Sequence, residues 1–433
     1  MKRLLLVGLN ELNFEIISKY AKKYSGKYKY LEKLLELNLE ELETEDEYKN
    51  LEPWIQWYSI HTGKKYDEHK VFRLGDAQHA EHEQIYEVLE KKGFKVGAVS
   101  PMNAKNNLNN PLYFIPDPWT ETSSDGTFFS TIYHKAISQS VNDNSKGNLS
   151  LQTIFSILLC FVLFSNKKRF LHYLGLAVGS ITKKWKKALF LDLLTNDMHV
   201  NLVKRKKPNF SEVFLNSGAH IQHHYLRNSE FFKDNEECKN PDWYVNQDVD
   251  PFTDILHSFN LIAKDYLTMH EYEVIFCTGL TQKPIKPSFY YRLTDHKNFL
   301  EKLGLTNFKV IPRMTRDFVV YPDNPTDLDF IVSRFEKVMD SKGKKMFADI
   351  DKRTDSVFVT LTYDNEIKQD SLFYLDETKI FPFNDIVFVA IKNGQHDPRC
   401  FVMKTDNIGN MFEAKNKNIT YINEVINAYF QKI

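Results

Sequence analysis

The residues of this chain best suited to chemistry are three histidines, His220, His223 and His224, in the run 213–225. The run reads as a strand that continues into a helix. On a helix, His220 and His224 project from one face, and His220 and His223 lie one turn apart. Two imidazoles at either spacing can share one zinc-like ion, or contact a phosphate group as hydrogen-bond donors. The cluster therefore predicts metal or phosphate contact.

Two other segments place polar residues at the ends of expected strands. Asn10 and Glu11 follow the first apolar strand, and ligands of open α/β sheets sit at the carboxyl ends of strands. The alternative for Asn10 is a cap on the following helix. In the run 390–397 a late strand leads into a glycine-containing loop that ends in His396, where this histidine would complete a site begun by the histidine cluster. These residues are expected to converge on one pocket beside the first strand.

A fourth candidate is the polar and aromatic segment 52–63, which contains Gln56 and Ser59. This segment either lines a pocket or forms a buried aromatic turn that leads into a helix. The chain has no P-loop, no G-x-G-x-x-G, no HExxH and no G-x-S-x-G motif. Nucleotide-binding and serine-hydrolase functions therefore lack support.

Strand and helix signals alternate along the chain and must position these residues. The expected strands are 3–9, 94–99, 212–215, 272–277, 357–362 and 385–391, and the expected helices are 14–24, 81–92, 254–269 and 421–431. Strand–helix–strand units of this kind predict an α/β fold with a mostly parallel central sheet and helices on both faces.

Composition narrows the class of protein. The 57 basic and 57 acidic residues give a formal net charge of zero, which argues against a nucleic-acid binder. The four cysteines lie far apart, as expected in a reducing compartment. The apolar run 4–9 is shorter than the roughly 7–15 residues of a signal-peptide core, and the run 151–164 is shorter than the ~18–20 residues of a membrane span. We therefore expect a cytoplasmic protein.

The segment 149–208 interrupts the alternation and is helical, apolar and basic. Its excess of positive over negative side chains is nine. We predict a core built from 1–148 and 209–433, with 149–208 inserted as a helical cap. The cap is either a solvated insertion or a surface that lies on the inner membrane or over a phosphorylated substrate. Interleaved phenylalanine, leucine and Trp185 favour the membrane contact.

Taken in order, these segments resemble the alkaline phosphatase superfamily, in particular its phosphodiesterase and nucleotide pyrophosphatase branch. The turn Gly8-Leu-Asn-Glu11 resembles a metal-binding "GLDG" turn, and Ser59-Ile-His-Thr-Gly63 followed by His69 resembles the end of the nucleophile loop. The run 219–225 resembles the "D-x-x-Q-H" metal motif, and Gly394-Gln-His396 resembles the late "G-x-H" histidine. The resemblance spans most of the chain and implies an alkaline phosphatase-like fold.

The chain departs from that pattern at three positions. Asn10 stands where the family has a metal-binding aspartate, the nucleophile position falls at 53–56 where no hydroxyl exists, and 277–280 replaces an Asp–His pair. The resemblance therefore implies that one of the two family ions is lost. The remaining ligands for a single zinc-like ion are His220, His223 or His224, and His396.

These residues predict an enzyme that transfers or hydrolyses a phosphate- or sulfate-linked group on a surface-glycan or lipid-linked precursor. Its histidines would bind the metal or stabilise the transition state, and Glu11 would be the general base or acid. The predicted catalytic residues are Asn10, Glu11, Gln56 and Ser59.

Two alternatives remain open. A conventional metal-dependent phosphodiesterase would take its ligands from other acids, such as Asp76, Asp117 or Asp295. A pseudoenzyme would bind a glycan or a partner protein without turnover.

Overall fold

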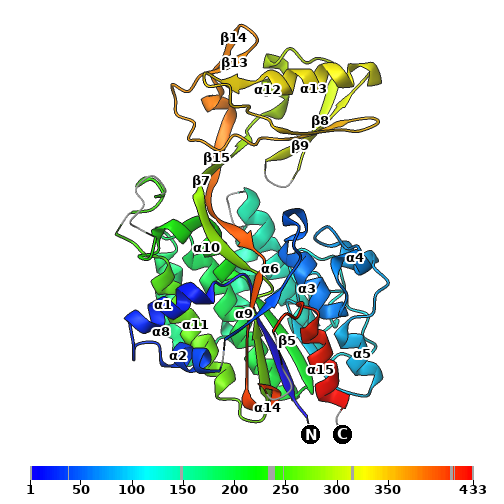
Figure 1. Ribbon diagram of the computed structural model, residues 1–433, viewed down its shortest axis with the longest axis vertical. Coiled ribbons are helices and arrows are strands. Elements are labelled where there is room, and N and C mark those ends of the chain that lie inside the picture. The colour runs from blue at the N-terminus through cyan, green and yellow to red at the C-terminus, as the bar shows by residue number, and fades with distance from the viewer. Residues whose placement is uncertain are drawn as a thin grey trace. The chain divides into compact units, whose positions relative to one another are not determined.

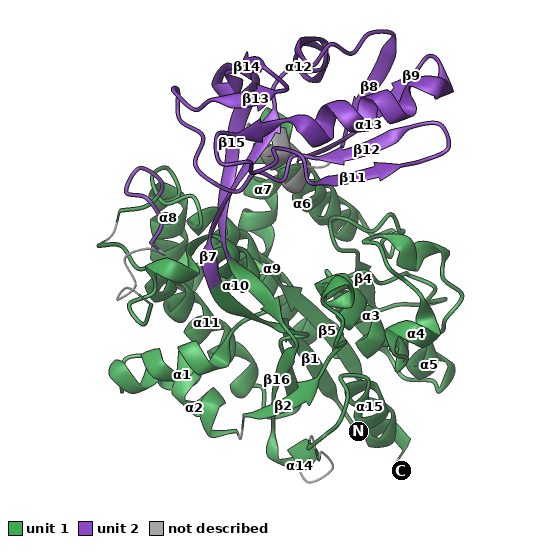
Figure 2. Ribbon diagram, turned by 45° about the horizontal axis from the view of Figure 1, so that its top comes forward, with its two compact units in different colours: residues 1–234, 245–284, 394–433 green, residues 235–244, 285–393 purple. Residues whose placement is uncertain are grey.

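The protein is described by a computed structural model (Figure 1). The structure describes residues 2–37, 39–146, 150–232, 239–246, 248–313, 316–409, 413 and 415–431. Within them the chain divides into two compact units. Unit 1 contains residues 1–234, 245–284 and 394–433, and unit 2 contains residues 235–244 and 285–393 (Figure 2). The sequence prediction did not separate unit 2 from the segment 209–433, and its boundary at 148–149 lies outside the described residues.

The described part of unit 1 is built on a seven-stranded sheet of order β2-β16-β6-β1-β5-β3-β4. Its strands are β1 (Leu4–Leu9), β2 (Glu40–Glu43), β3 (Val96–Val99), β4 (Tyr113–Ile115), β5 (Phe210–Leu215), β6 (Glu273–Cys277) and β16 (Arg399–Lys404). β1 is parallel to β5 and β6, and β3 is parallel to β4 and β5. β16 runs antiparallel to both of its neighbours, β2 and β6. The predicted α/β class with a mostly parallel sheet is confirmed.

β1 lies in the interior of the sheet, and every one of its residues is buried. A strand covered on both faces needs a continuous apolar run, which Leu-Leu-Leu-Val-Gly-Leu supplies. Because β1, β5 and β6 are parallel, the residues that follow them meet at one edge of the sheet. That edge carries Asn10, Asn216 and Thr278.

Helices cover both faces of the sheet. On one face, α3 (Pro53–Thr62), α5 (Ile85–Lys91) and α15 (Tyr421–Gln431) share an apolar core with Leu4 and Leu6 of β1. Against the other face pack α9 (Lys186–Lys206), α11 (Phe252–Leu267) and α10 (Ser217–Tyr225), and α2 (Lys29–Glu36) and α1 (Phe14–Lys23) adjoin them. The remaining helices of this unit are α4 (Tyr66–His69), α6 (Phe128–Lys146), α7 (Leu151–Phe164), α8 (Phe170–Gly179) and α14 (Asp406–Gly409).

The chain enters and leaves the 285–393 part of unit 2 through two paired strands, β7 (Thr281–Leu293) and β15 (Ile386–Asp397). Unit 2 has an antiparallel sheet of β11 (Asp349–Lys352), β12 (Val357–Thr360), β9 (Asp317–Pro322) and β8 (Phe308–Pro312). Its other elements are β10 (Met339–Asp340), β13 (Phe373–Leu375), β14 (Thr378–Ile380), α12 (His296–Lys302) and α13 (Leu328–Lys337). The strands expected at 357–362 and 385–391 therefore exist, but neither belongs to the central sheet.

Candidate functional site

The turn after β1 holds Asn10 and Glu11 at the carboxyl edge of the sheet. The Asn10 N–H donates to the carbonyl of Leu215 (3.0 Å), and the Glu11 N–H donates to that of Thr278 (2.9 Å). Glu11 has a φ of +56°, in the left-handed region. For a residue with a Cβ this conformation costs roughly 1–2 kcal/mol. The two neighbouring strand ends thus fix a glutamate where the backbone favours glycine.

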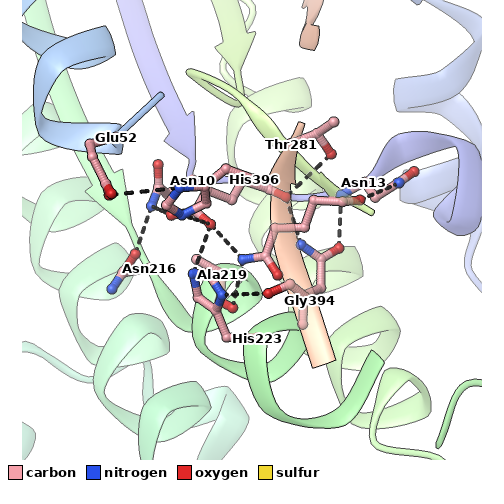
Figure 3. Close-up of polar contacts among 12 residues, drawn as sticks. Asn10, Asn13, Glu52, Asn216, Ala219, His223, Thr281, Gly394 and His396 are labelled. Atoms are coloured by element: carbon pink, nitrogen blue, oxygen red, sulfur yellow. Dashed lines mark hydrogen bonds and ion pairs between the residues drawn. The ribbon is translucent and has the colours of Figure 1, made fainter. Parts of the chain in front are cut away.

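Two histidines that are far apart in the sequence, His223 and His396, lie close together (Figure 3), and both contact Glu11. His223 of α10 places Nε2 3.0 Å from Glu11 Oε2, and His396 of β15 places Nε2 3.2 Å from the same oxygen. Ligand atoms of the three side chains lie within 4.8 Å of one another. Across the described residues, this is the one group of histidine, cysteine and acidic side chains close enough to hold an ion. We call it the Glu11–His223–His396 cluster.

Each imidazole of the cluster faces an acceptor through its other nitrogen. His223 Nδ1 lies 3.2 Å from the carbonyl oxygen of Gly394, and His396 Nδ1 lies 3.7 Å from Glu52 Oε2. A carbonyl oxygen can only accept, so Nδ1 of His223 carries a proton and Nε2 is directed at Glu11. Metal-binding histidines are oriented in this way by carbonyl and carboxylate groups.

The Glu11 side chain is held by amide donors on several sides. Gln282 Nε2 donates to Oε2, Asn10 Nδ2 donates to Oε1 (3.1 Å), and Gln222 Nε2 donates to the Glu11 backbone carbonyl (2.6 Å). Two side-chain amides therefore hold the carboxylate itself, and a third holds the backbone carbonyl of the same residue.

The cluster requires positive charge around Glu11. Burial by itself raises the pKa of this carboxyl, but the charges of His396 and His223 and their hydrogen bonds outweigh burial, so the pKa lies well below its usual range. Glu11 is therefore an ionised carboxylate that is only 2% exposed. An unprotonated Nε2 would turn its lone pair toward this oxygen and repel it. The arrangement is stable when protons on the imidazoles or a cation intervene.

The residues fit a single divalent ion. Two imidazole nitrogens and one carboxylate oxygen form a ligand set found in catalytic zinc sites, which keep a fourth position open. In a tetrahedral shell with bonds of ~2.0–2.1 Å, ligand atoms lie about 3.3 Å apart. The N–O separations of 3.0 and 3.2 Å are close to this spacing. The cluster thus has the donor types of a zinc-like site, and its two N–O separations match the spacing of such a site.

The other two histidines of α10 lie outside the cluster. The rings of His220 and His224 contact each other, with centroids 5.0 Å apart, as their spacing predicts. Burial and then the charge of His223 lower the pKa of His220 to about 4. No described acidic side chain completes an ion site around this pair. The rotation of α10 about its axis places His223 next to Gly394. The cluster therefore contains one histidine of α10, His223, and not the pair His220 and His224 expected from their spacing.

Gln56 and Ser59 take part in local contacts of α3. The Gln56 side chain donates to the carbonyl of Asn50 (2.9 Å), and Ser59 Oγ lies 3.1 Å from His69 Nε2. His69 Nδ1 accepts from the Val71 N–H (3.0 Å), so the proton of this imidazole is on Nε2 and points at Ser59. His69 therefore cannot take a proton from Ser59 through this contact. The predicted catalytic roles of Gln56 and Ser59 have no geometric support.

Sequence reasoning missed the part that Trp57 plays at this sheet edge. The ring is fully buried, and Nε1 donates to Asn10 Oδ1 (2.9 Å). A Cβ on Gly8 would lie 2.6 Å from the ring, and one on Gly279 would lie 2.5 Å from Nε1. Trp57 thus fills the space between the end of β1 and the turn after β6. Gly8 and Gly279, which lie next to the motifs, were the signal in the sequence that could have indicated this close packing.

The three aspartates of the conventional phosphodiesterase alternative accept local backbone hydrogen bonds. Asp117 is buried in a turn and receives three backbone N–H groups, at 2.6 to 2.7 Å. Asp76 receives a neighbouring backbone N–H at 3.0 Å, and Asp295 caps α12. None of them belongs to an ion-sized group of described side chains.

No family model matches the sequence, and no curated protein matches it. Solved structures overlap with nearly the whole chain. Phosphonoacetate hydrolase from Sinorhizobium meliloti, in complex with phosphonoformate, has a TM-score of 0.43 at 10% identity and covers 99% of this chain and 96% of its own. Murine ectonucleotide pyrophosphatase/phosphodiesterase 5 has a TM-score of 0.44 at 9% identity, with 99% and 95% covered. TAB5 alkaline phosphatase has a TM-score of 0.40 at 10% identity, and the match covers 99% of this chain and 97% of the TAB5 chain.

These proteins are members of the superfamily that the sequence motifs resemble. Overlap at such identities and TM-scores carries no argument about chemistry.

Proposed function

We propose that the protein is an enzyme that uses one divalent metal ion to hydrolyse or transfer a phosphate- or sulfate-linked group. The observation that carries this proposal is the convergence of Glu11, His223 and His396 at the carboxyl edge of a mostly parallel sheet. Ligand sites of open α/β sheets occupy this edge. A ligand set with an open position suits an ester hydrolase or transferase better than a purely structural metal site.

The side chains of the site would share the work as follows. The two imidazoles and Glu11 would hold the ion, Gln282 would fix the Glu11 carboxylate, and Glu52 would orient His396. When bound, the ion would polarise an ester oxygen and lower the pKa of a coordinated water. Because the Glu11 pKa is low and its oxygens are engaged, we assign Glu11 to metal binding instead of the general acid or base role expected from the sequence.

Two features favour a single ion over the pair used by a conventional phosphodiesterase. Asn10 carries no charge where the resembled turn has an aspartate, and Glu11 supplies a carboxylate where that turn has a glycine. Trp57 fills the space between Gly8 and Gly279, beside the segment that replaces the Asp–His pair. Compared with the resembled turn, the carboxylate therefore stands one residue later in the sequence. The indole ring of Trp57 occupies the space near Asn10.

For the substrate we propose an anionic ester of a surface glycan or of a lipid-linked precursor. The basic and apolar segment 149–208 belongs to the same compact unit as the cluster and motivates this class. Phosphate and sulfate esters both present anionic oxygens to a cationic site.

The experiment that tests the proposal compares three chromogenic esters, namely nitrophenyl phosphate, bis-nitrophenyl phosphate and nitrophenyl sulfate. Protein freed of metal by a chelator is assayed before and after addition of zinc or manganese. We expect metal-dependent hydrolysis of at least one ester, with kcat/KM at least about 100-fold lower in His396→Ala. His224→Ala is the matched control, because it removes a neighbouring imidazole outside the cluster and should retain activity.

Two results would overturn the proposal. Absence of hydrolysis with every ester and metal would favour the pseudoenzyme that binds without turnover. Equal activity of His396→Ala and wild type would place any hydrolysis elsewhere in the chain.

A further inference from the structure

Helix α7 exposes a stripe of large apolar side chains. Leu151, Phe155, Leu158 and Val162 are 86%, 68%, 55% and 62% exposed. Their spacing of three to four residues places them along one side of the helix. Water-facing stripes of this kind are unusual in a folded chain and mark interaction surfaces.

Helix α8 carries a second stripe of the same character. Its exposed residues, including one just beyond the helix, are Phe170, Leu171, Leu174, Val178 and Ile181. The two helices are in contact, because Phe161 of α7 packs on Phe170 and Tyr173 of α8, with ring centroids 6.4 and 5.0 Å apart. We call the two stripes together the α7–α8 apolar surface.

Buried polar contacts anchor this surface to the core of unit 1. Arg169, which precedes α8, is 8% exposed and pairs with Asp197 (2.8 Å) and Asp265. The Tyr173 hydroxyl also donates to Asp197 (2.7 Å). Asp197 and Asp265 belong to α9 and α11, which pack against the sheet. The apolar stripes therefore lie on helices held in place by the fold.

Trp185 does not contribute to the surface. It is 4% exposed, and its Nε1 donates to Asp254 (2.9 Å). This corrects the sequence expectation that Trp185 supports a membrane contact.

Exposed lysines flank helix α8 in the sequence. Lys167 and Lys168 connect the two helices, Lys184 and Lys187 follow α8, and all four are exposed. The sequence contains no aspartate or glutamate from 144 to 191. Apolar side chains bordered by lysine fit a bilayer interface with anionic headgroups, where each lysine near the surface adds about 1 kcal/mol of attraction.

We propose that the α7–α8 apolar surface docks onto an anionic phospholipid bilayer and lies in its interfacial plane. α7 has 14 residues and is about 21 Å long, shorter than the ~30 Å hydrocarbon core. Among the described helices none has the length and apolar character to cross a membrane. A second copy of the chain is the poorer occupant, because it would bring the same lysines against each other.

The test is vesicle flotation of the full chain. We expect the protein to float with vesicles of phosphatidylcholine containing about 30% phosphatidylglycerol and to remain in solution with phosphatidylcholine alone. Leu158→Glu combined with Leu171→Glu should lower partitioning at least about tenfold. Phe330→Glu combined with Phe381→Glu is the matched control, since these residues of unit 2 are similarly exposed, at 51% and 57%.

Thermal unfolding of both double variants should match that of wild type, because all four side chains are exposed. Three results would overturn the proposal: no flotation with anionic vesicles, equal loss in the control variant, or a dimer in solution that Leu158→Glu with Leu171→Glu dissociates. Each is independent of ester hydrolysis, so this surface and the metal site can fail separately.

Discussion

At Glu11, two imidazoles approach one buried carboxylate oxygen, and this contact controls what the site can bind. Imidazole and carboxylate groups bind a divalent ion only in their deprotonated forms. Metal uptake by the Glu11–His223–His396 cluster should therefore weaken as pH falls. The cluster is thus a metal site whose affinity depends on pH.

Asn10→Asp tests whether this turn accepts a second ion. Asn10 Nδ2 donates to Glu11 Oε1 (3.1 Å) and to Asn216 Oδ1 (2.8 Å), so aspartate would turn an oxygen toward two acceptors. We expect the variant to lose about 2–3 kcal/mol of unfolding free energy at pH 7, measured by chemical denaturation. The loss should shrink at lower pH, where the new carboxyl can be protonated and donate.

The control is Asn166→Asp, since Asn166 is exposed and its side-chain oxygen accepts from the Lys168 N–H, which a carboxylate oxygen can also do. This substitution should be nearly neutral. Uptake of a second metal equivalent by Asn10→Asp, without loss of stability, would support the conventional two-metal alternative instead.

Several site residues could be predicted from sequence and others could not. Glu11 follows the apolar strand β1, so its place at the sheet edge is a consequence of parallel topology. His396 lies in β15, outside the central sheet, so that topology does not explain why it approaches Glu11. The choice of His223 over His220 and His224 depends on the rotation of α10 about its axis, which spacing alone does not determine. Gln282 was missed because a glutamine that supports a carboxylate has no sequence motif.

At the scale of elements, the contact between β1 and α3 depends on glycine. Gly8→Ala should lower the unfolding free energy by about 1–3 kcal/mol, because the new Cβ would lie 2.6 Å from the buried Trp57 ring. Gly175→Ala in α8 is the control. A Cβ there meets nothing within 4 Å, so alanine should stabilise the helix by about 0.5–1 kcal/mol. Equal effects of the two substitutions in thermal or chemical unfolding would contradict this packing.

Most elements of the central sheet could be predicted, because its strands are buried apolar runs followed by helical periodicity. β1, β3, β5 and β6 lie close to their expected ranges. The strands at β12 and β15 were expected as well, but a short apolar run does not specify its partner strand. The antiparallel partners of these strands come from segments that are distant in the sequence. The local pattern therefore predicted that the strands exist but not which sheet they join.

For the whole molecule, buried neutral histidines make stability depend on pH. Burial lowers the pKa of His199 from 6.5 to about 3, while Tyr266 and Ser211 bond its two nitrogens. The unfolded chain therefore takes up a proton first as pH falls below about 6.5, and stability is lost in that direction. Between pH 7 and 5 this residue alone should remove about 2 kcal/mol.

His199→Gln should flatten the pH dependence by that amount, as measured by denaturant unfolding at several pH values. His270→Gln is the control, because His270 is exposed and the slope should not change. An unchanged slope in His199→Gln would show that its protonation is not linked to folding.

The central claim is that one metal ion is held by Glu11, His223 and His396, and metal analysis of dialysed protein tests it most directly. We predict one equivalent of a zinc-like ion in wild type and in His224→Ala, and less than about a tenth of an equivalent in His223→Ala and His396→Ala. Two equivalents in wild type, or one equivalent retained by both cluster variants, would contradict the account.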